Sequence, residues 1–428
     1  MNVKSAVLLV TGAAVAFAGA TFYTKKTYEN TIDHQLAIYK EVPSVKGVTM
    51  ERTVIEEGFF WVNDEYRISL DPEFFNTMGG TISSTTSLKF AVNNDCHIFP
   101  FYISCDNRFE PSNDKITQEM AQHLQKVPYE SNWSLNALTR TIHSSFSVED
   151  AVFEENGADI TIHPLHLFST TDFDLKEVQF ELEWEGAMLA LPEEKLTWQF
   201  SQLATRGEMS RVFGTTFVYS IKTKINNYGF YTPLADIFKG EHLSFSTETV
   251  LHNDDTFSVE YTLKNALMQT FPPAAPGILE NVEFNFVVAG FDKAAAELYA
   301  RLTPVPSTDN EESLIAMLDA VGAKPLTITL DKLSFKYNEV PFQAQGRADI
   351  QPFKYAELLA GYGAEKLQAE LSVQLGKHVT EVLPQFAPML EQYVQMGMIE
   401  QDEDGAYKSQ VQFNRKQLRA NDNVVQQF

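Results

Sequence analysis

Alternation of apolar and polar residues with a period of two dominates this chain. Residues 256–263 (TFSVEYTL) place Phe257, Val259, Tyr261 and Leu263 on one face of an extended segment, with polar residues on the other. This is the pattern of a strand with one side in water, and many such strands must share a core. The same alternation recurs in residues 178–184, 217–221, 243–245, 282–286, 326–330 and 367–375.

Turn-forming residues separate several of these strands. They occur at residues 252–255 (HNDD), at 338–341 (NEVP) and at Asp404-Gly405, which precedes an extended segment over 407–413. Short connections of this chemistry join antiparallel neighbours in hairpins. The strands are therefore expected to be largely antiparallel.

A few segments predict helices between groups of strands. Capping residues and prolines place these helices at 293–302 after Asp292, at 311–321 after Asp309 or Asn310 with Gly322 closing it, at 114–127, and at about 377–396 with bends at Pro384 and Pro388. Helices interspersed among strand groups are typical of an α+β fold. The expected fold is thus α+β and β-dominated, with largely antiparallel sheets behind an N-terminal membrane helix.

That membrane helix is predicted by residues 5–23 (SAVLLVTGAAVAFAGATFY), which carry no charge and are flanked by Lys4, Lys25 and Lys26. Nineteen residues at about 1.5 Å each give roughly 28 Å of helix, close to the ~30 Å hydrocarbon core of a bilayer. A cleaved secretory signal is the alternative, because residues 16–20 contain small-x-small cleavage patterns. The apolar run continues beyond those sites, which favours an uncleaved anchor. A helix in the core of a cytosolic protein is the third interpretation.

Proline content suggests where the rest of the chain divides. Residues 269–277 (QTFPPAAPG) hold three prolines and predict a linker. We therefore expect a membrane anchor over residues 1–27, a β-rich domain over 28–271 and an α+β domain over 272–428.

The net charge of the chain narrows the classes of partner that the protein is expected to bind. The 428 residues include 33 Lys and Arg against 57 Asp and Glu, a formal net charge of −24. Such an acidic body repels phosphate backbones, so nucleic-acid binding is disfavoured, as is close docking of the body on anionic lipid headgroups. With 44% hydrophobic residues and 32 Phe, the chain can bury a large core.

The two cysteines, Cys96 and Cys105, are the chain's only thiols. In an oxidising compartment a pair this close in sequence predicts a disulfide between neighbouring strands, and two buried free thiols are the alternative. A zinc site is disfavoured because His97 is the only further ligand beside them.

Residues with catalytic or metal-binding chemistry do not form a recognisable motif. His163 and His166 lie three residues apart on an extended segment and face opposite sides, so one metal ion cannot easily bind both. The acidic run 400–404 (EQDED) lacks the spacing of a calcium loop. No catalytic residue, metal site or cofactor is predicted.

The order of features resembles the YdgA-like family of bacterial envelope proteins. The resemblance rests on the N-terminal anchor and on five later blocks, residues 56–70 (EEGFFWVNDEYRISL), 97–101 (HIFPF), 280–302, 326–350 and 367–422. It implies an inner-membrane protein with a cytoplasmic N-terminus and a periplasmic body, which the balanced lysines do not decide by themselves. It implies no catalytic residue, because the family has no known function.

Two function classes follow. The first is a non-enzymatic envelope protein, bound to the inner membrane through residues 5–23, that binds a partner protein or an apolar ligand such as a lipid. Its candidate binding face is the stripe Phe257, Val259, Tyr261 and Leu263. The alternative is an envelope hydrolase with a site assembled from dispersed residues. An apolar groove would favour binding, and a polar cleft with clustered acids or histidines would favour catalysis.

Overall fold

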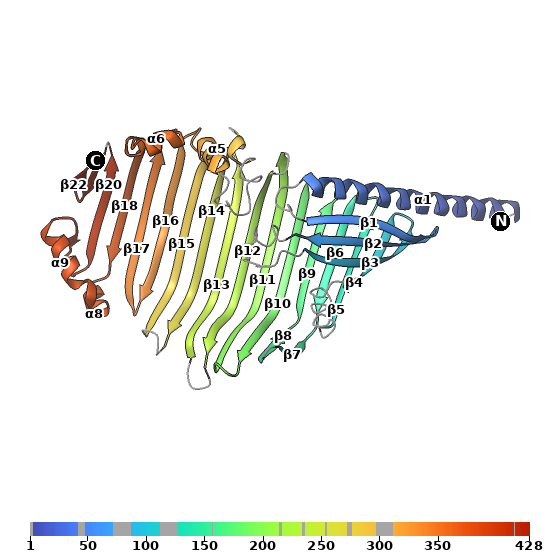
Figure 1. Cartoon of the computed structure of the whole chain (residues 1–428), viewed down its shortest axis with the longest axis horizontal. Helices are drawn as coiled ribbons and strands as arrows, with labels where there is room; N and C mark the ends of the chain where they lie inside the picture. The colour runs from blue at the N-terminus through green and yellow to red at the C-terminus, as the bar shows by residue number, and fades with distance from the viewer. Residues whose placement is uncertain are drawn as a thin grey trace.

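A computed structural model describes most of the chain (Figure 1). The described residues are 3–41, 48–71, 87–111, 127–155, 157–213, 216–232, 236–252, 255–271, 276–296, 311–414 and 416–428. The helices are α1 (Val3–Glu41), α5 (Glu311–Val321), α6 (Tyr355–Leu359), α7 (Gly363–Lys366), α8 (Val379–Val382), the 3-10 helix η2 (Pro384–Phe386) and α9 (Ala387–Gln395).

The strands follow one another along an elongated molecule. The first group is β1 (Val48–Glu57), β2 (Trp61–Leu70), β3 (Leu88–Phe99), β4 (Tyr102–Pro111), β5 (Tyr129–Asn136), β6 (Thr141–Val148), β7 (Ala151–Glu155), β8 (Ala158–Ile162) and β9 (Leu165–Asp172). The second is β10 (Glu177–Leu191), β11 (Leu196–Phe213), β12 (Thr216–Tyr231), β13 (Asp236–Leu251), β14 (Thr256–Thr270), β15 (Gly277–Asp292), β16 (Leu326–Tyr337), β17 (Val340–Ile350), β18 (Leu367–Leu375), β19 (Glu400–Gln401), β20 (Tyr407–Asn414), β21 (Gln417–Ala420) and β22 (Asn423–Gln427).

All these strands belong to one antiparallel sheet, so the prediction of a β-dominated fold with an antiparallel sheet is confirmed. Neighbours in the sheet are mostly neighbours in the chain, because short turns connect them. The exceptions are the β7–β8 hairpin, which lets β6 pair with β9, and the short β19, which lies between β18 and β20 in the chain and lets these two strands pair. The expected division near residue 272 falls between β14 and β15, and these two strands pair with each other along their length. The sheet is therefore continuous across that position.

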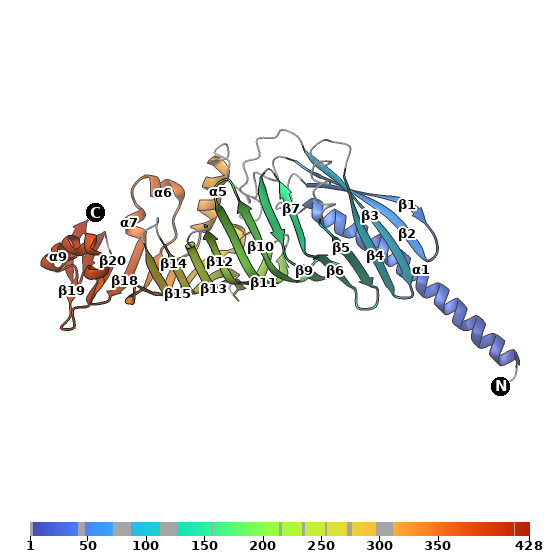
Figure 2. The same ribbon diagram turned by 90° about the horizontal axis from the view of Figure 1, so that it is seen from below.

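At the N-terminal end, β1 to β6 curve around the second half of α1 and form what we call the cradle (Figure 2). Tyr28 and Ile32 of the helix are buried there against Val62, Ile98 and Leu135 of the strands. This apolar contact fixes the helix to the sheet. The cradle also contains the cysteine pair: Cys96 and Cys105 lie directly opposite each other on β3 and β4, fully buried and joined by a disulfide.

Charged groups are buried inside the same contact. The Tyr28 hydroxyl donates a hydrogen bond to Asp64 Oδ2, and Arg52 Nε lies 2.6 Å from the same oxygen. The Arg52 guanidinium also lies 4.9 Å from the centre of the Tyr28 ring. Burial raises the pKa of the Tyr28 hydroxyl far above its usual range, so it remains a donor to the carboxylate. The carboxylate of Asp64 thus connects the helix to β1 and β2.

The helix predictions have mixed outcomes. The helix over 311–321 is confirmed as α5, and residues 293–296 are helical, with Asp292 Oδ1 accepting a hydrogen bond from the Ala295 amide at 2.8 Å. The single helix expected over 377–396 is wrong. It is divided into α8, η2 and α9, because Leu383, the residue before Pro384, leaves the helical conformation with φ −127° and ψ 66°. The segment expected at 114–127 lies almost entirely outside the described residues.

The predicted membrane helix lies within α1, which continues without a break from the apolar run into the cradle. Side chains are described for residues 13–38 of this helix. Within the described part of the chain, the apolar stretch of every helix falls short of what crossing a membrane requires.

Candidate functional site

One side of the long sheet, from β10 to β18, is lined with apolar residues, and we call it the apolar face. The strand register places Tyr261 of β14 directly opposite Thr247 of β13 and Phe286 of β15. Residues that are paired in this way point to the same side of a sheet. One complete row across the sheet is Leu182, Thr205, Thr223, Phe245, Leu263, Phe284, Leu333, Ala344 and Val373. At about 4.8 Å between strands, this row is roughly 38 Å wide.

A line of residues with a non-extended backbone crosses β11 to β15, and we call it the crease. It keeps the apolar residues on this side along the length of each strand. Gln202, His242 and Asn281 have left-handed φ values of 54°, 53° and 51°, at matching positions on alternate strands. The alternation changes parity at the crease. On β11 the apolar residues before it are even-numbered, Trp198 and Phe200, and those after it are odd-numbered, Leu203 and Met209. An extra non-extended residue in a strand reorients the side chains that follow it.

Contacts across the crease confirm that both halves face the same side. The Phe200 ring lies 4.7 Å from the ring of Trp184, which is paired with Leu203 on the other side of the crease. Similarly, Asn265 donates a hydrogen bond to the Tyr228 hydroxyl from the opposite side of the crease. In β10 to β15 the apolar face therefore follows the strands over most of their 15–18 residues.

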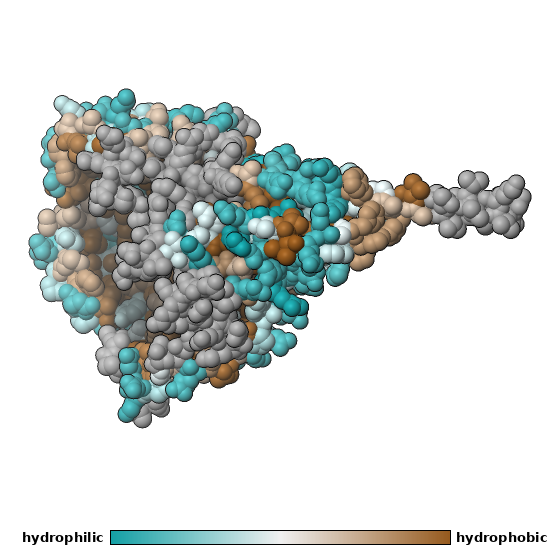
Figure 3. Space-filling view, turned by 45° about the vertical axis from the view of Figure 1, so that its right-hand side comes forward, coloured by the Kyte–Doolittle hydropathy of each residue, from teal (hydrophilic) through white to brown (hydrophobic). Residues whose placement is uncertain are grey.

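The packing against this face is incomplete. The buried hydrophobic clusters of the described residues lie at the two ends of the molecule, in the cradle and beneath α8 and α9. Between them, Phe245 is 38% exposed and Phe230 is 41% exposed. Hydrophobic residues gather in a hollow on the long sheet (Figure 3). Apolar side chains so far from full burial leave a surface that can bind an apolar molecule.

The predicted stripe on β14 belongs to this face but is not uniformly exposed. Phe257, at the start of the strand, is only 2% exposed. Val259, Tyr261 and Leu263 are half-buried and extend toward the middle of the sheet. Phe257 therefore supports the sheet, and the other three form the half-buried part of the stripe.

Several polar atoms on the apolar face are buried. Trp184 Nε1, Thr247 Oγ1, Thr249 Oγ1 and Asn265 Oδ1 are shielded from solvent and have no hydrogen-bond partner within the described residues. Burial also raises the pKa of the Tyr228 hydroxyl beside Asn265. A few donors and acceptors in an apolar lining are typical of sites for amphipathic ligands, because the polar groups orient the ligand.

The opposite side of the same strands is polar and charged. Lys264 Nζ lies 2.9 Å from Glu283 Oε1, and Lys332 contacts the other oxygen of that carboxylate. These hydrogen bonds lower the pKa of Glu283 to about 2. The long sheet is thus a layer with one side adapted to water and one adapted to apolar contact.

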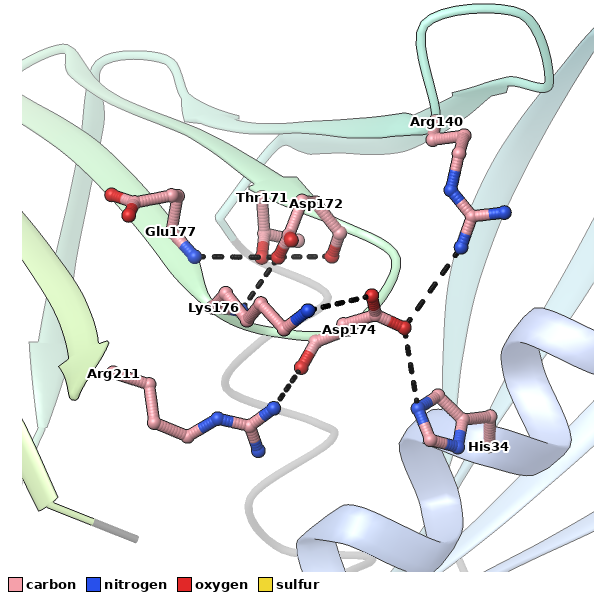
Figure 4. A network of polar contacts seen from close by, with 8 residues as sticks. All are labelled: His34, Arg140, Thr171, Asp172, Asp174, Lys176, Glu177 and Arg211. Carbon is pink, nitrogen blue, oxygen red and sulfur yellow. Dashed lines mark hydrogen bonds and ion pairs between the residues drawn. The ribbon is translucent and has the colours of Figure 1, made fainter. Parts of the chain in front are cut away.

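A polar network joins the cradle to the long sheet at the β9–β10 turn (Figure 4). The Asp174 carboxylate lies 3.5 Å from His34 Nε2 of α1, 3.9 Å from Arg140 Nη2 and 3.4 Å from Lys176 Nζ. Its backbone carbonyl accepts a hydrogen bond from Arg211 Nη2 of β11 at 2.7 Å. The carboxylate contacts basic side chains from α1, from the β5–β6 turn and from its own turn, so its role here is to hold these segments together.

The other residues considered from sequence do not assemble a reactive site. His163 Nδ1 lies 3.1 Å from Asp150 Oδ1, whereas His166 stacks beside Phe168. In the acidic run, Asp402 pairs with Lys408 at 3.1 Å. No group of three metal-binding side chains was found in the part of the chain that the structure describes.

Sequence reasoning missed the crease and the unpartnered polar atoms. A signal for the crease exists, because apolar positions 200 and 203, and likewise 225 and 228, are separated by three residues instead of two. The polar atoms could not be found in this way, because their burial depends on strands that are distant in sequence.

Comparison with known proteins gives a family but no activity. A family model described as a bacterial protein of unknown function (DUF945) matches residues 2–426. Neither the curated proteins nor the solved structures contain a match. The chain therefore belongs to this bacterial family of unknown function, over nearly its whole length.

Proposed function

We propose that this protein is a non-enzymatic, inner-membrane-anchored protein of the bacterial envelope, and that its apolar face holds an extended apolar ligand such as the acyl chains of a lipid. The observation that carries the proposal is the apolar face itself, a half-exposed row of aliphatic and aromatic side chains from β10 to β18. Burying such a surface against hydrocarbon is favourable by about 25 cal/mol per Å².

The chemistry of the face favours an amphipathic ligand over a purely apolar one. Trp184 Nε1 can donate a hydrogen bond, and Asn265 Oδ1 can accept one, within the apolar lining. Once the side chains that shield these atoms move aside, an ester or amide group of a lipid would satisfy the atoms while its chains cover the neighbouring rings. The charged opposite side remains in water, so the protein does not need a second layer on that side.

Two features support the proposed location at the inner membrane. The uncharged run 5–23 is bracketed by lysines, and the resemblance to YdgA-like envelope proteins supports a periplasmic body. A periplasmic body also suits the disulfide in the cradle, since such bonds persist in oxidising compartments.

Lipid co-purification tests the proposal. The full chain would be purified from membranes in mild detergent, and bound lipid would be extracted and quantified by mass spectrometry. Tyr261→Asp places a charge in the middle of the apolar face, and Thr262→Asp is its matched control, because Thr262 lies on the opposite side of the same strand.

The proposal expects lipid on the wild-type protein and on Thr262→Asp, and a large loss of lipid from a folded Tyr261→Asp protein. Wild-type protein without lipid would contradict it. The proposal would also be contradicted if the wild-type protein carried no lipid and the Tyr261→Asp protein were unfolded, because the stripe would then be ordinary core.

A further inference from the structure

Aromatic side chains surround α1 at the point where it leaves the cradle. Phe17, Phe22 and Tyr23 lie on the helix, and Phe59, Phe60 and Phe101 lie on the β1–β2 and β3–β4 turns. We call these six residues the aromatic collar. Their exposed fractions run from 36% for Phe101 to 64% for Phe22. Exposed aromatic residues gathered in this way around one helix need an explanation other than core packing.

Residues of the collar on the helix are in contact with residues of the collar on both turns. The ring centres of Phe17 and Phe60 are 6.2 Å apart, those of Tyr23 and Phe101 are 6.3 Å apart, and Phe59 and Phe60 contact each other edge to face at 4.8 Å. The two turns flank the helix as it leaves the cradle (Figure 2).

Polar contacts fix the two turns to the helix. The Thr24 hydroxyl, fully buried, accepts a hydrogen bond from the Phe101 amide at 2.7 Å. Lys25 Nζ lies 2.8 Å from Glu57 Oε2 and donates to the Gly58 carbonyl at 3.1 Å. The collar is therefore held in place by contacts on both turns.

The backbone at Phe101 points to a role for its ring. Phe101 has a φ of 63° in the turn that follows Pro100. Glycine or asparagine adopts this left-handed conformation more easily than an aromatic residue does. A phenylalanine at this position costs backbone strain, which a function of the exposed ring would explain.

We propose that the aromatic collar seats this end of the protein in the headgroup layer of a lipid bilayer. The inference rests on the membrane anchor of the proposed function. We choose a bilayer as the partner of the collar because the collar is continuous with the anchor. Phe17, Phe22 and Tyr23 lie in the last turns of the uncharged run 5–23. Tyrosine is enriched where membrane helices meet the headgroups, because its ring is amphipathic. Phenylalanine is common on protein surfaces that enter the boundary between headgroups and acyl chains.

Contact between the aromatic collar and the headgroup layer, which we call the seat, would set the orientation of the whole body. The helix continues unbroken from the apolar run into the cradle, so no flexible joint separates the membrane from the sheet. The long sheet extends from the cradle away from the N-terminus (Figure 1). The acidic body, with its net charge of −24 for the whole chain, is repelled by anionic headgroups. The body therefore stands on its cradle end, with the apolar face leading away from the bilayer.

Spin-label accessibility in reconstituted vesicles tests this arrangement. The full chain carrying Phe60→Cys would be labelled with a nitroxide and reconstituted into phosphatidylcholine and phosphatidylglycerol vesicles. Both native cysteines are buried in a disulfide and do not compete for the label. Phe59→Cys is a second collar site in case the first variant folds poorly. Leu359→Cys on α6, 71% exposed and distant from the cradle, is the matched control.

We expect the collar labels to be several-fold more accessible to dissolved oxygen, relative to a polar nickel complex, than the label at residue 359. Equal accessibility ratios in vesicle-bound protein would overturn the seat while leaving the anchor intact. Protein that does not remain with the vesicles after alkaline carbonate washing would overturn the anchor and the seat together.

Discussion

Truncation of Phe245 tests the apolar face at its centre, and the structure sets the expected magnitude. Phe245 lies on β13 between Thr223 and Leu263 and is 38% exposed without ligand. A phenylalanine side chain offers about 200 Å², so a bound apolar chain can cover roughly 75 Å² of it. At about 25 cal/mol per Å², that contact contributes about 2 kcal/mol to binding. Phe245→Ala should therefore weaken binding roughly 25-fold.

Phe168→Ala is the matched control for this substitution. Phe168 lies on β9 opposite Glu181, on the charged side of the sheet, and is 51% exposed. It offers more free aromatic surface than Phe245 but on the wrong side for the ligand. Its truncation should change affinity by less than about twofold.

Equilibrium titration with a fluorescent fatty acid measures both affinities. Circular dichroism melts would confirm that each variant is folded at the temperature of the titration. This check is needed because Phe245→Ala also removes partly buried area. Equal affinities for wild type and Phe245→Ala, or equal losses in the two variants, would refute the assignment of the ligand to the apolar face.

Three further outcomes are expected elsewhere in the molecule. Asp64→Ala should lower the free energy of unfolding in urea by about 3–5 kcal/mol, because it removes the buried carboxylate that pairs with the Arg52 guanidinium. Asp33→Ala removes a 74% exposed partner of the same guanidinium and should cost less than about 1 kcal/mol. Equal losses would contradict the role of the buried pair. Cys96 and Cys105 should give no thiol signal in unreduced, denatured protein, and reduction should cost about 2–3 kcal/mol of stability; two titratable thiols would contradict the bond. A C-terminal reporter should be active only if it works in the periplasm, and activity of a cytoplasmic reporter would reverse the orientation.

Local pattern was enough to predict the strands, their antiparallel pairing and α5. Period-two alternation fixes which residues of a strand share a side, so the β14 stripe could be identified from its own sequence. The second half of α1 could also have been predicted. Tyr28, Ile32 and Leu36 recur every four residues after the lysines, which indicates a helix with one buried stripe.

The candidate site needed information that no local pattern carries. Whether Phe245 is covered or half-exposed depends on what the rest of the chain places against it. The crease is similar, because the left-handed residues at 202, 242 and 281 line up only once the strands are in register. The burial of Asn265 Oδ1 depends in the same way on neighbouring strands.

Photocrosslinking in living cells tests the central claim most directly. The photoreactive amino acid p-benzoylphenylalanine would replace Phe245 on the apolar face or Phe168 on the charged side, and the purified full-length protein would be analysed by intact mass spectrometry. The account predicts adducts with the masses of membrane lipids at residue 245 and none at residue 168. Crosslinks from residue 245 only to the protein's own chain, or lipid adducts of equal yield at both positions, would contradict it.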